Sequence, residues 1–94
     1  MDASLKIKLP VKEHWVVYIV RCSDGTLYTG ITKDVVRRCQ QHQAGNASKY
    51  TRSRRPVSLI YEELCSDQSS ALKREVAIKG LTRREKLQLV RQGK

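Results

Sequence analysis

The sequence is poor in the residues that build small metal-binding or disulfide-stabilised domains. It has three cysteines, an odd number, and only two histidines among its 94 residues. No Cys-x-x-Cys pair occurs, whereas a structural zinc site needs a full set of clustered ligands. We therefore expect Cys22, Cys39 and Cys65 to be reduced thiols that pack as small apolar residues, without a structural metal or a disulfide framework.

Long apolar runs are also missing. No stretch of about 18 apolar residues occurs, so no membrane-spanning helix is predicted. The N-terminus lacks the basic-then-apolar order of a signal peptide, because Lys6, Lys8, Lys12 and Glu13 interrupt any apolar run. These absences predict a cytoplasmic protein without a membrane partner.

Acidic residues are scarce. Nine Asp and Glu stand against 19 Lys and Arg, which gives a formal net charge of +10. An excess of this size predicts a polyanionic partner, and nucleic acid is the commonest one. The alternative is a basic protein that its charge merely keeps in solution.

The length allows one small domain, because typical domains run to roughly 100 or more residues. We predict a basic N-terminal arm over residues 1–13 and a single domain over residues 14–92. A β-branched and aromatic run predicts an interior strand over residues 14–22. An Asp-Gly turn and an antiparallel partner over residues 27–31 follow. Gly30 within that partner predicts a bulge or a close backbone approach.

The rest of the domain predicts helices and one more strand, an α+β arrangement. A helix is expected from Thr32 or Asp34 to about residue 43, and residues 44–55 are expected to form a polar loop. A third strand over residues 57–65 would have Leu59, Tyr61 and Leu64 as its apolar members. A helix capped at residue 66 or 67 should run to about residue 80, and a Thr-x-x-Glu capping box predicts another from Thr82.

Two of these helices carry a charged residue on the side that should face the sheet. Arg38 lies on the side of the first helix that Val35, Cys39 and His42 mark at helical spacing. A plain surface helix would instead place arginine on its solvent side.

Glu75 has the equivalent position on the second helix, in line with Ala71 and Ile78. An unpaired charge removed from water costs several kcal/mol, so Arg38 and Glu75 need partners or a water-filled cleft. One interpretation is a salt bridge between these two residues. The other is a cleft in which Arg38 clamps a phosphate and Glu75 holds a divalent cation, with Lys79 as a simple i, i+4 partner of Glu75.

Two tyrosine motifs precede these residues and carry a family resemblance. The motifs and the polar residues that follow them are Val17-Tyr18-Ile19, Tyr28-Thr29-Gly30, Arg38, His42 and Glu75. Their order and separation resemble the GIY-YIG nuclease domain over about residues 15–81. The closest resemblance is to small bacterial members of the UPF0213 group, which are similar to the nuclease domain of SLX-type resolvases. Val17 and Thr29 depart from the motif but leave both tyrosines in place.

The resemblance implies a fold, a reaction and a set of site residues. The fold is α+β, a small three-stranded antiparallel sheet flanked by about three helices. The reaction is hydrolysis of phosphodiester bonds with one divalent metal, Mg²⁺ or in its place Mn²⁺. Catalytic roles are implied for Tyr18, Tyr28, Arg38, His42 and Glu75, with Glu75 also the metal ligand.

The chemistry assigns each residue an expected role. Arg38 would supply an always-charged fork for two phosphate oxygens. Tyr18 is expected to be the general base or to position the water, with Tyr28 and His42 in its proton network. A phenol with a pKa near ~10 is a poor base at neutral pH, which makes His42 a rival for the base. Alternatively, Tyr18 and Tyr28 are ordinary strand aromatics and His42 simply ends a helix.

A basic cluster surrounds Tyr50 in the predicted polar loop. Its members are Lys49, Arg52, Arg54 and Arg55. We expect these residues to bind nucleic acid, with Tyr50 stacked on an unpaired base and the basic side chains on backbone phosphates. The alternative is a merely solvated loop.

The leading hypothesis is therefore a magnesium-dependent endonuclease that acts on DNA, at branched, nicked or single-stranded structures, with RNA as an alternative substrate and DNA repair as its setting. Cleaving family members usually carry a second domain that selects the DNA, and this chain shows none. A nucleic-acid-binding module with weak or no catalysis is thus one rival. A nuclease subunit that needs a protein partner for substrate binding is the other.

Overall fold

The computed structural model describes residues 14–93, so the arm predicted over residues 1–13 lies outside the described residues. The described chain has three strands and four helices. Their order is β1 (Trp15–Arg21), β2 (Leu27–Thr32), α2 (Val35–Ala44), α3 (Lys49–Arg52), β3 (Ser58–Cys65), α4 (Gln68–Lys79) and α5 (Arg83–Gln92). The predicted α+β fold with a three-stranded antiparallel sheet is confirmed.

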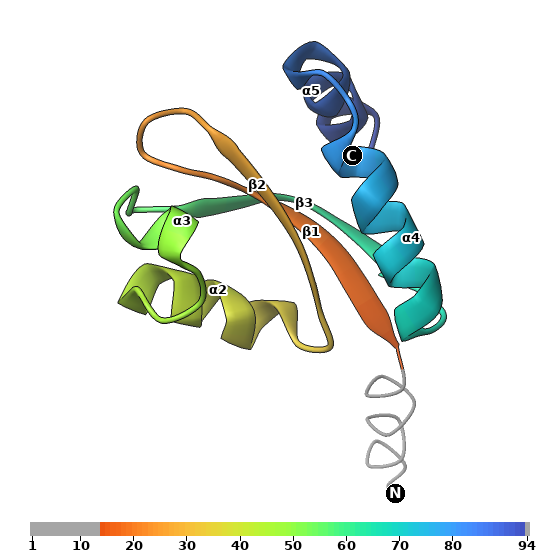
Figure 1. The fold of residues 1–94 in the computed structure, drawn as a ribbon, viewed down its shortest axis with the longest axis horizontal. Helices are drawn as coiled ribbons and strands as arrows, with labels where there is room; N and C mark the ends of the chain where they lie inside the picture. The colour runs from red at the N-terminus through yellow and green to blue at the C-terminus, as the bar shows by residue number, and fades with distance from the viewer. Residues whose placement is uncertain (1–13, 94) are drawn as a thin grey trace, which may run out of the picture.

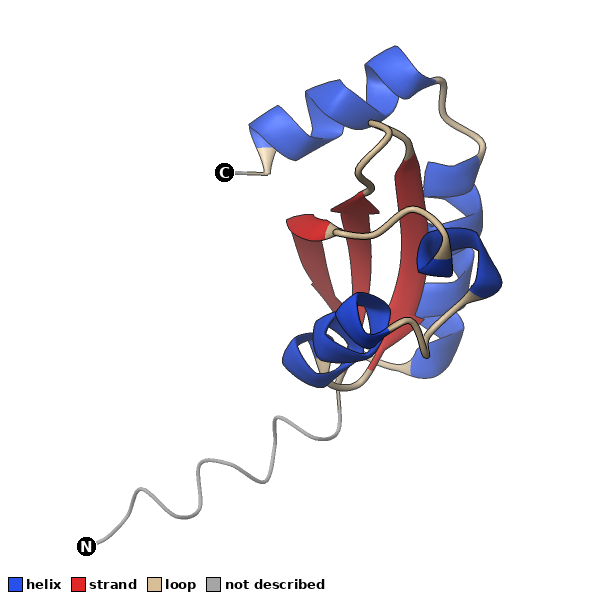
Figure 2. Ribbon diagram, turned by 90° about the vertical axis from the view of Figure 1, so that its left-hand side faces the viewer, coloured by secondary structure: helices blue, strands red, loops and turns tan. Residues whose placement is uncertain are grey.

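The sheet lies between two helical layers. Its strand order is β2-β1-β3, so β1 is the central strand and pairs antiparallel with both neighbours. Helices α2 and α3 lie on one face of the sheet, and α4 lies on the other with α5 beyond it (Figure 1). Figure 2 shows the same arrangement from the side, with the strands in red between the blue helices.

Burial on both faces explains the composition of β1. Val17 and Ile19 pack in a core with Ala71 and Ile78 of α4. Their neighbour Tyr18 packs on the opposite face, where Val35 and Cys39 of α2 contribute to a second core. A central strand covered on both faces needs apolar side chains in both directions, which is why the sequence reads as a continuous β-branched and aromatic run.

Side-chain caps start the three longer helices where the sequence predicts them. Asp34 accepts the backbone N–H of Arg37 at 3.1 Å at the start of α2. Asp67 accepts that of Ser70 at 2.8 Å at the start of α4. At α5, Thr82 forms the complete predicted capping box. Each cap satisfies a backbone donor that would otherwise lack a partner.

The expectation that residues 44–55 form only a polar loop is wrong. This segment contains α3, whose cap Ser48 accepts the backbone N–H of Thr51 at 3.1 Å. A helix of four residues has no apolar periodicity of its own. Only the serine cap marked it in the sequence.

The apolar pattern expected for β3 holds only at Tyr61, which is buried. Leu59 is 38% exposed and Leu64 is 67% exposed. The register explains the exposure of Leu59. The pairing of β3 with β1 shifts by one residue between Ile19 and Val20, so that Tyr61 pairs with Ile19 but Leu59 pairs with Val20. The bulge places Leu59 and Tyr61 on opposite faces of the sheet.

None of the helices in residues 14–93 is long and apolar enough to cross a membrane.

Gly30 confirms the predicted close approach of the backbone. It pairs with Tyr18 across β1 and β2. A Cβ atom at residue 30 would lie 2.6 Å from Tyr18 Oη and 2.8 Å from its Cζ, closer than van der Waals contact allows. The phenol ring of Tyr18 therefore occupies the space that any side chain at this position would need.

We predict that Gly30→Ala lowers the free energy of unfolding by about 1–3 kcal/mol, because the added methyl group must displace the Tyr18 ring. Urea denaturation measures the change. Gly80→Ala is the matched control: its nearest neighbour is the Ala77 carbonyl at 3.5 Å, so its effect should stay within about 0.5 kcal/mol. Equal stability of the two variants would contradict the close approach.

Candidate active site

A buried pair of polar rings forms the centre of the candidate site. Tyr18 Oη on β1 lies 2.9 Å from Nε2 of His42 on α2, and the two rings meet edge to face with centroids 5.7 Å apart. Tyr18 is 1% exposed and His42 is 0% exposed. The position of His42 on the inner side of its helix is confirmed, and its partner shows why a polar residue is tolerated there.

A residue that the sequence did not single out completes the surroundings of His42. Thr51 Oγ1 lies 2.8 Å from His42 Nδ1, and Thr51 is also fully buried. Ser48 Oγ lies 3.0 Å from the same Thr51 oxygen. Helix α3 therefore closes over His42. The Ser-x-x-Thr spacing of its cap was the only local signal, and it does not name the histidine.

Tyr28 and Tyr50 extend the ring cluster toward solvent. The half-buried Tyr28 meets His42 edge to face with centroids 5.4 Å apart. Tyr50 of α3 stacks on Tyr28 at 5.9 Å, and Arg54 Cζ lies 4.0 Å from the Tyr50 centroid. The Tyr50 ring therefore already contacts two protein groups.

Arg38 joins the cluster from α2. Its Nε donates to Gln41 Oε1 at 2.9 Å, and its positive charge acts to lower the pKa of the nearby Tyr18. It also lines a hollow of about 400 Å³ together with the cationic side chains of Lys33 and Arg37 and the carboxylate of Asp34.

Burial keeps both members of the pair neutral. It raises the pKa of Tyr18 to about 12, with a further contribution from Tyr28, while the hydrogen bond and charge of Arg38 act in the opposite direction. Burial lowers the pKa of His42, and the positive charge of Arg38 lowers it further. At neutral pH Tyr18 is therefore a phenol that can donate a hydrogen bond, and His42 is an uncharged imidazole.

Glu75 stands in the other helical layer. Its side chain is only 16% exposed, and Oε2 lies 3.4 Å from Lys79 Nζ, which confirms the expected i, i+4 pair. Helix α4 packs on the face of β1 and β2 opposite α2. Across residues 14–93 no ion pair joins Glu75 to Arg38, so the salt-bridge interpretation is not what the structure shows.

The described residues offer a divalent ion one carboxylate, Glu75, and not a cage of protein ligands. Within residues 14–93 no group of three or more His, Cys, Asp and Glu side chains converges. All three cysteines are free thiols; Cys22 is buried, whereas Cys39 and Cys65 are partly buried. A single shielded carboxylate, Glu75, fits Mg²⁺, which usually keeps several waters and takes few protein ligands.

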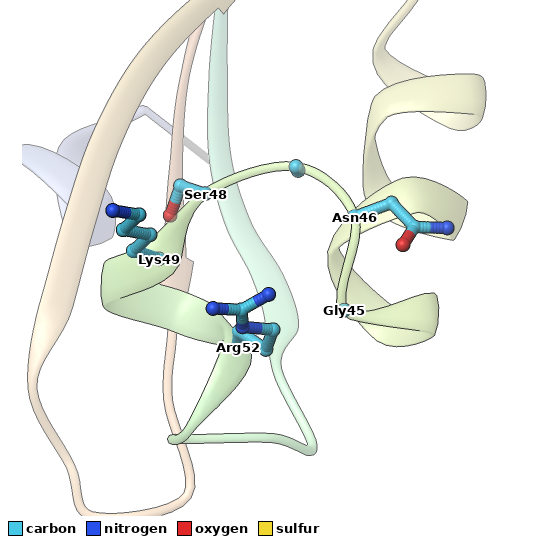
Figure 3. Close-up of a pocket in the computed structure, with 6 residues that line it drawn as sticks. Gly45, Asn46, Ser48, Lys49 and Arg52 are labelled. Atoms are coloured by element: carbon cyan, nitrogen blue, oxygen red, sulfur yellow. The ribbon is translucent and has the colours of Figure 1, made fainter.

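Two side chains of the basic cluster project from α3, and two hydrogen bond to other parts of the protein. Lys49 and Arg52 are exposed and line a hollow of about 340 Å³ between α2 and α3. Figure 3 shows both side chains projecting from α3.

Arg54 and Arg55 are held by other groups. Arg54 Nε lies 3.1 Å from Asp24 Oδ2 in the β1–β2 turn, and its Nη1 donates to the Tyr50 carbonyl at 2.8 Å. Arg55 donates to the carbonyls of Arg52 and Gln43. These two arginines join segments of the fold as well as adding positive charge.

Comparison with known proteins assigns the chain to a family. Residues 14–88 match the GIY-YIG catalytic domain. UPF0213 proteins of Staphylococcus aureus strains Mu50 and N315 are each 54% identical to this chain over 76 residues, 81% of this chain and 93% of the relative. The solution NMR structure of UPF0213 protein BH0048 from Bacillus halodurans is similar with a TM-score of 0.56 and 42% identity, covering 84% of each chain. The chain therefore belongs to the GIY-YIG nuclease family, within its UPF0213 group.

Proposed function

We propose that the protein is a divalent-metal-dependent endonuclease that hydrolyses phosphodiester bonds in DNA. The observation that carries this proposal is the convergence of Tyr18, Tyr28, Arg38 and His42 in one cluster within the GIY-YIG domain. The strands and α2 hold these groups together although up to 24 residues separate them in the chain.

Arg38 is proposed to bind the scissile phosphate. It is half-buried at the rim of the cluster, and Gln41 holds its guanidinium through a hydrogen bond of 2.9 Å. A guanidinium fixed in this way keeps its charge at any relevant pH and offers paired donors to phosphate oxygens. Such a donor stabilises the charge that builds up on phosphorus in the transition state.

The two tyrosines are proposed to have different roles. Tyr18 is buried, bonded to His42 and has its pKa raised to about 12, which disfavours it as the base in the free protein. Tyr28 is half-buried and lies between the buried His42 and the exposed Tyr50. We therefore propose that Tyr28 faces the attacking water, while Tyr18 and His42 hold Arg38 and Tyr28 in place.

Glu75 is proposed to hold the divalent ion, Mg²⁺ or in its place Mn²⁺. When bound, the ion would supply Lewis-acid stabilisation of negative charge on the phosphate and the leaving oxygen. Within the described residues no hydrogen bond or ion pair joins Glu75 to the ring cluster, and its carboxylate pairs with Lys79. That separation favours the second candidate function, a nucleic-acid-binding module without catalysis.

The DNA is proposed to enter over α3. Lys49 and Arg52 offer exposed charges beside the ring cluster, as backbone phosphates require. A preference for branched or single-stranded DNA, a protein partner, a role in DNA repair and a cytoplasmic location stay predictions from the sequence.

We predict that Glu75→Gln and Arg38→Lys each reduce Mg²⁺-dependent DNA cleavage by about 10²–10³-fold. The first removes the charge of the proposed metal ligand. The second keeps a positive charge but removes the paired donors that stabilise the transition state. Single-turnover cleavage of branched, nicked and single-stranded oligonucleotides measures the rates. Glu85→Gln is the control for the loss of one carboxylate, because Glu85 is exposed on α5 and glutamine can keep its capping-box hydrogen bond, so this variant should cleave at the wild-type rate.

Equal cleavage by wild type and Glu75→Gln would mean that a contaminant or a different site is responsible. DNA binding without cleavage in either Mg²⁺ or Mn²⁺ would support the binding module instead.

We predict that Lys49→Gln combined with Arg52→Gln weakens DNA binding alike for all sequences. The slope of log K against log salt should become less negative by about 1.4–1.8, because each of the two phosphate contacts contributes roughly 0.7–0.9. Fluorescence anisotropy over a salt series gives the slopes.

The matched control is Lys73→Gln combined with Arg91→Gln, which removes the same charge from exposed positions on α4 and α5. If both double variants shift the slope equally, the effect comes from net charge and not from the surface of α3.

A further inference from the structure

We propose that Thr51 is a positioning residue that holds His42 in the tautomer whose Nε2 accepts the hydroxyl proton of Tyr18. The tautomer is a property of the folded chain, and its consequence for cleavage rests on the proposed function. No feature of the tyrosine motifs, Arg38 or Glu75 points to this threonine, which belongs to the short helix α3.

The geometry places Thr51 as the only partner of one ring nitrogen among the described residues. Its Oγ1 lies 2.8 Å from His42 Nδ1, and both residues are 0% exposed. The same oxygen lies 3.0 Å from Ser48 Oγ and 3.4 Å from the Ser48 carbonyl. The hydroxyl can therefore accept from the ring and donate to Ser48 at the same time.

With the proton on Nδ1, each polar group of the hydrogen-bonded series Tyr18, His42 and Thr51 has a partner. Tyr18 O–H donates to Nε2, Nδ1–H donates to Thr51 Oγ1, and the Thr51 hydroxyl donates to an oxygen of Ser48. Each O–H and N–H donor of this buried series therefore has an acceptor.

The opposite tautomer leaves one group without a partner. Nε2–H would then donate to Tyr18 Oη. The hydroxyl proton of Tyr18 would have no acceptor among residues 14–93, although this side chain is 1% exposed. A buried hydroxyl without an acceptor is disfavoured, so the geometry selects the Nδ1–H form.

In the selected tautomer the hydrogen bonds run in one direction, from Thr51 on α3 toward the surroundings of Arg38. Thr51 orients His42, His42 orients the Tyr18 hydroxyl, and Tyr18 lies near enough to Arg38 for the guanidinium charge to act on the pKa of the phenol. The lowered pKa of His42 and the raised pKa of Tyr18 agree with this arrangement, since both keep the pair neutral. Thr51 thus acts on the phosphate-binding arginine without touching the substrate.

Two substitutions test the hydroxyl group and the branched shape of the Thr51 side chain separately. Thr51→Val keeps the branched shape and removes the oxygen, whereas Thr51→Ser keeps the oxygen. The measurement is a long-range proton–nitrogen NMR correlation of the His42 ring at neutral pH, which distinguishes a protonated from an unprotonated ring nitrogen. We expect a protonated Nδ1 and an unprotonated Nε2 in wild type and Thr51→Ser, and a mixed or reversed pattern in Thr51→Val.

Single-turnover cleavage provides the functional readout. Thr51→Val should cleave on the order of 10²-fold more slowly than wild type, and Thr51→Ser should stay within a few-fold. A protonated Nε2 in wild type overturns the proposal even if Thr51→Val does not fold. A wild-type tautomer and rate in Thr51→Val also overturn it. If wild type itself does not cleave, the proposed function fails. The protonation of the two His42 ring nitrogens in wild type and Thr51→Val still tests the role of Thr51.

Discussion

The hydrogen bond between Tyr18 and His42, 2.9 Å long and wholly buried, is the contact on which the rest of the structure depends. It joins the central strand to α2, and the Tyr18 ring beside it leaves room only for glycine at position 30 of the neighbouring strand. Because a buried polar pair is costly unless its groups are satisfied, the surrounding elements are arranged to satisfy it. Helix α3 supplies Thr51 for this purpose.

The same pair organises the charges of the candidate site. Its neutral rings fill the interior, and the cations lie around it: Arg38 against Tyr18, and Lys49 and Arg52 on α3. The candidate metal ligand is separate, because Glu75 belongs to the helix on the opposite face of the sheet.

Local signals in the sequence predicted the features that local interactions determine. The caps at Asp34, Asp67 and Thr82, the hairpin and the inward side of α2 all follow from short-range pattern. The bulge that separates Leu59 from Tyr61 could not be predicted, because strand register depends on the partner strand. Thr51 was missed for the same reason: its role comes from a histidine nine residues earlier on another helix. The roles of the site residues remain predictions.

The central claim is that His42 is buried, neutral and bonded at both ring nitrogens, and the pH dependence of stability tests it most directly. An unfolded histidine titrates near 6.5, and burial lowers the pKa of His42 in the folded chain. Below pH 6.5 the unfolded state therefore binds the extra proton, and stability is lost as the pH falls. Urea unfolding between pH 7.5 and pH 5 should show a steeper loss for wild type than for His42→Gln, which retains His14 and every carboxylate. Equal slopes would contradict the claim.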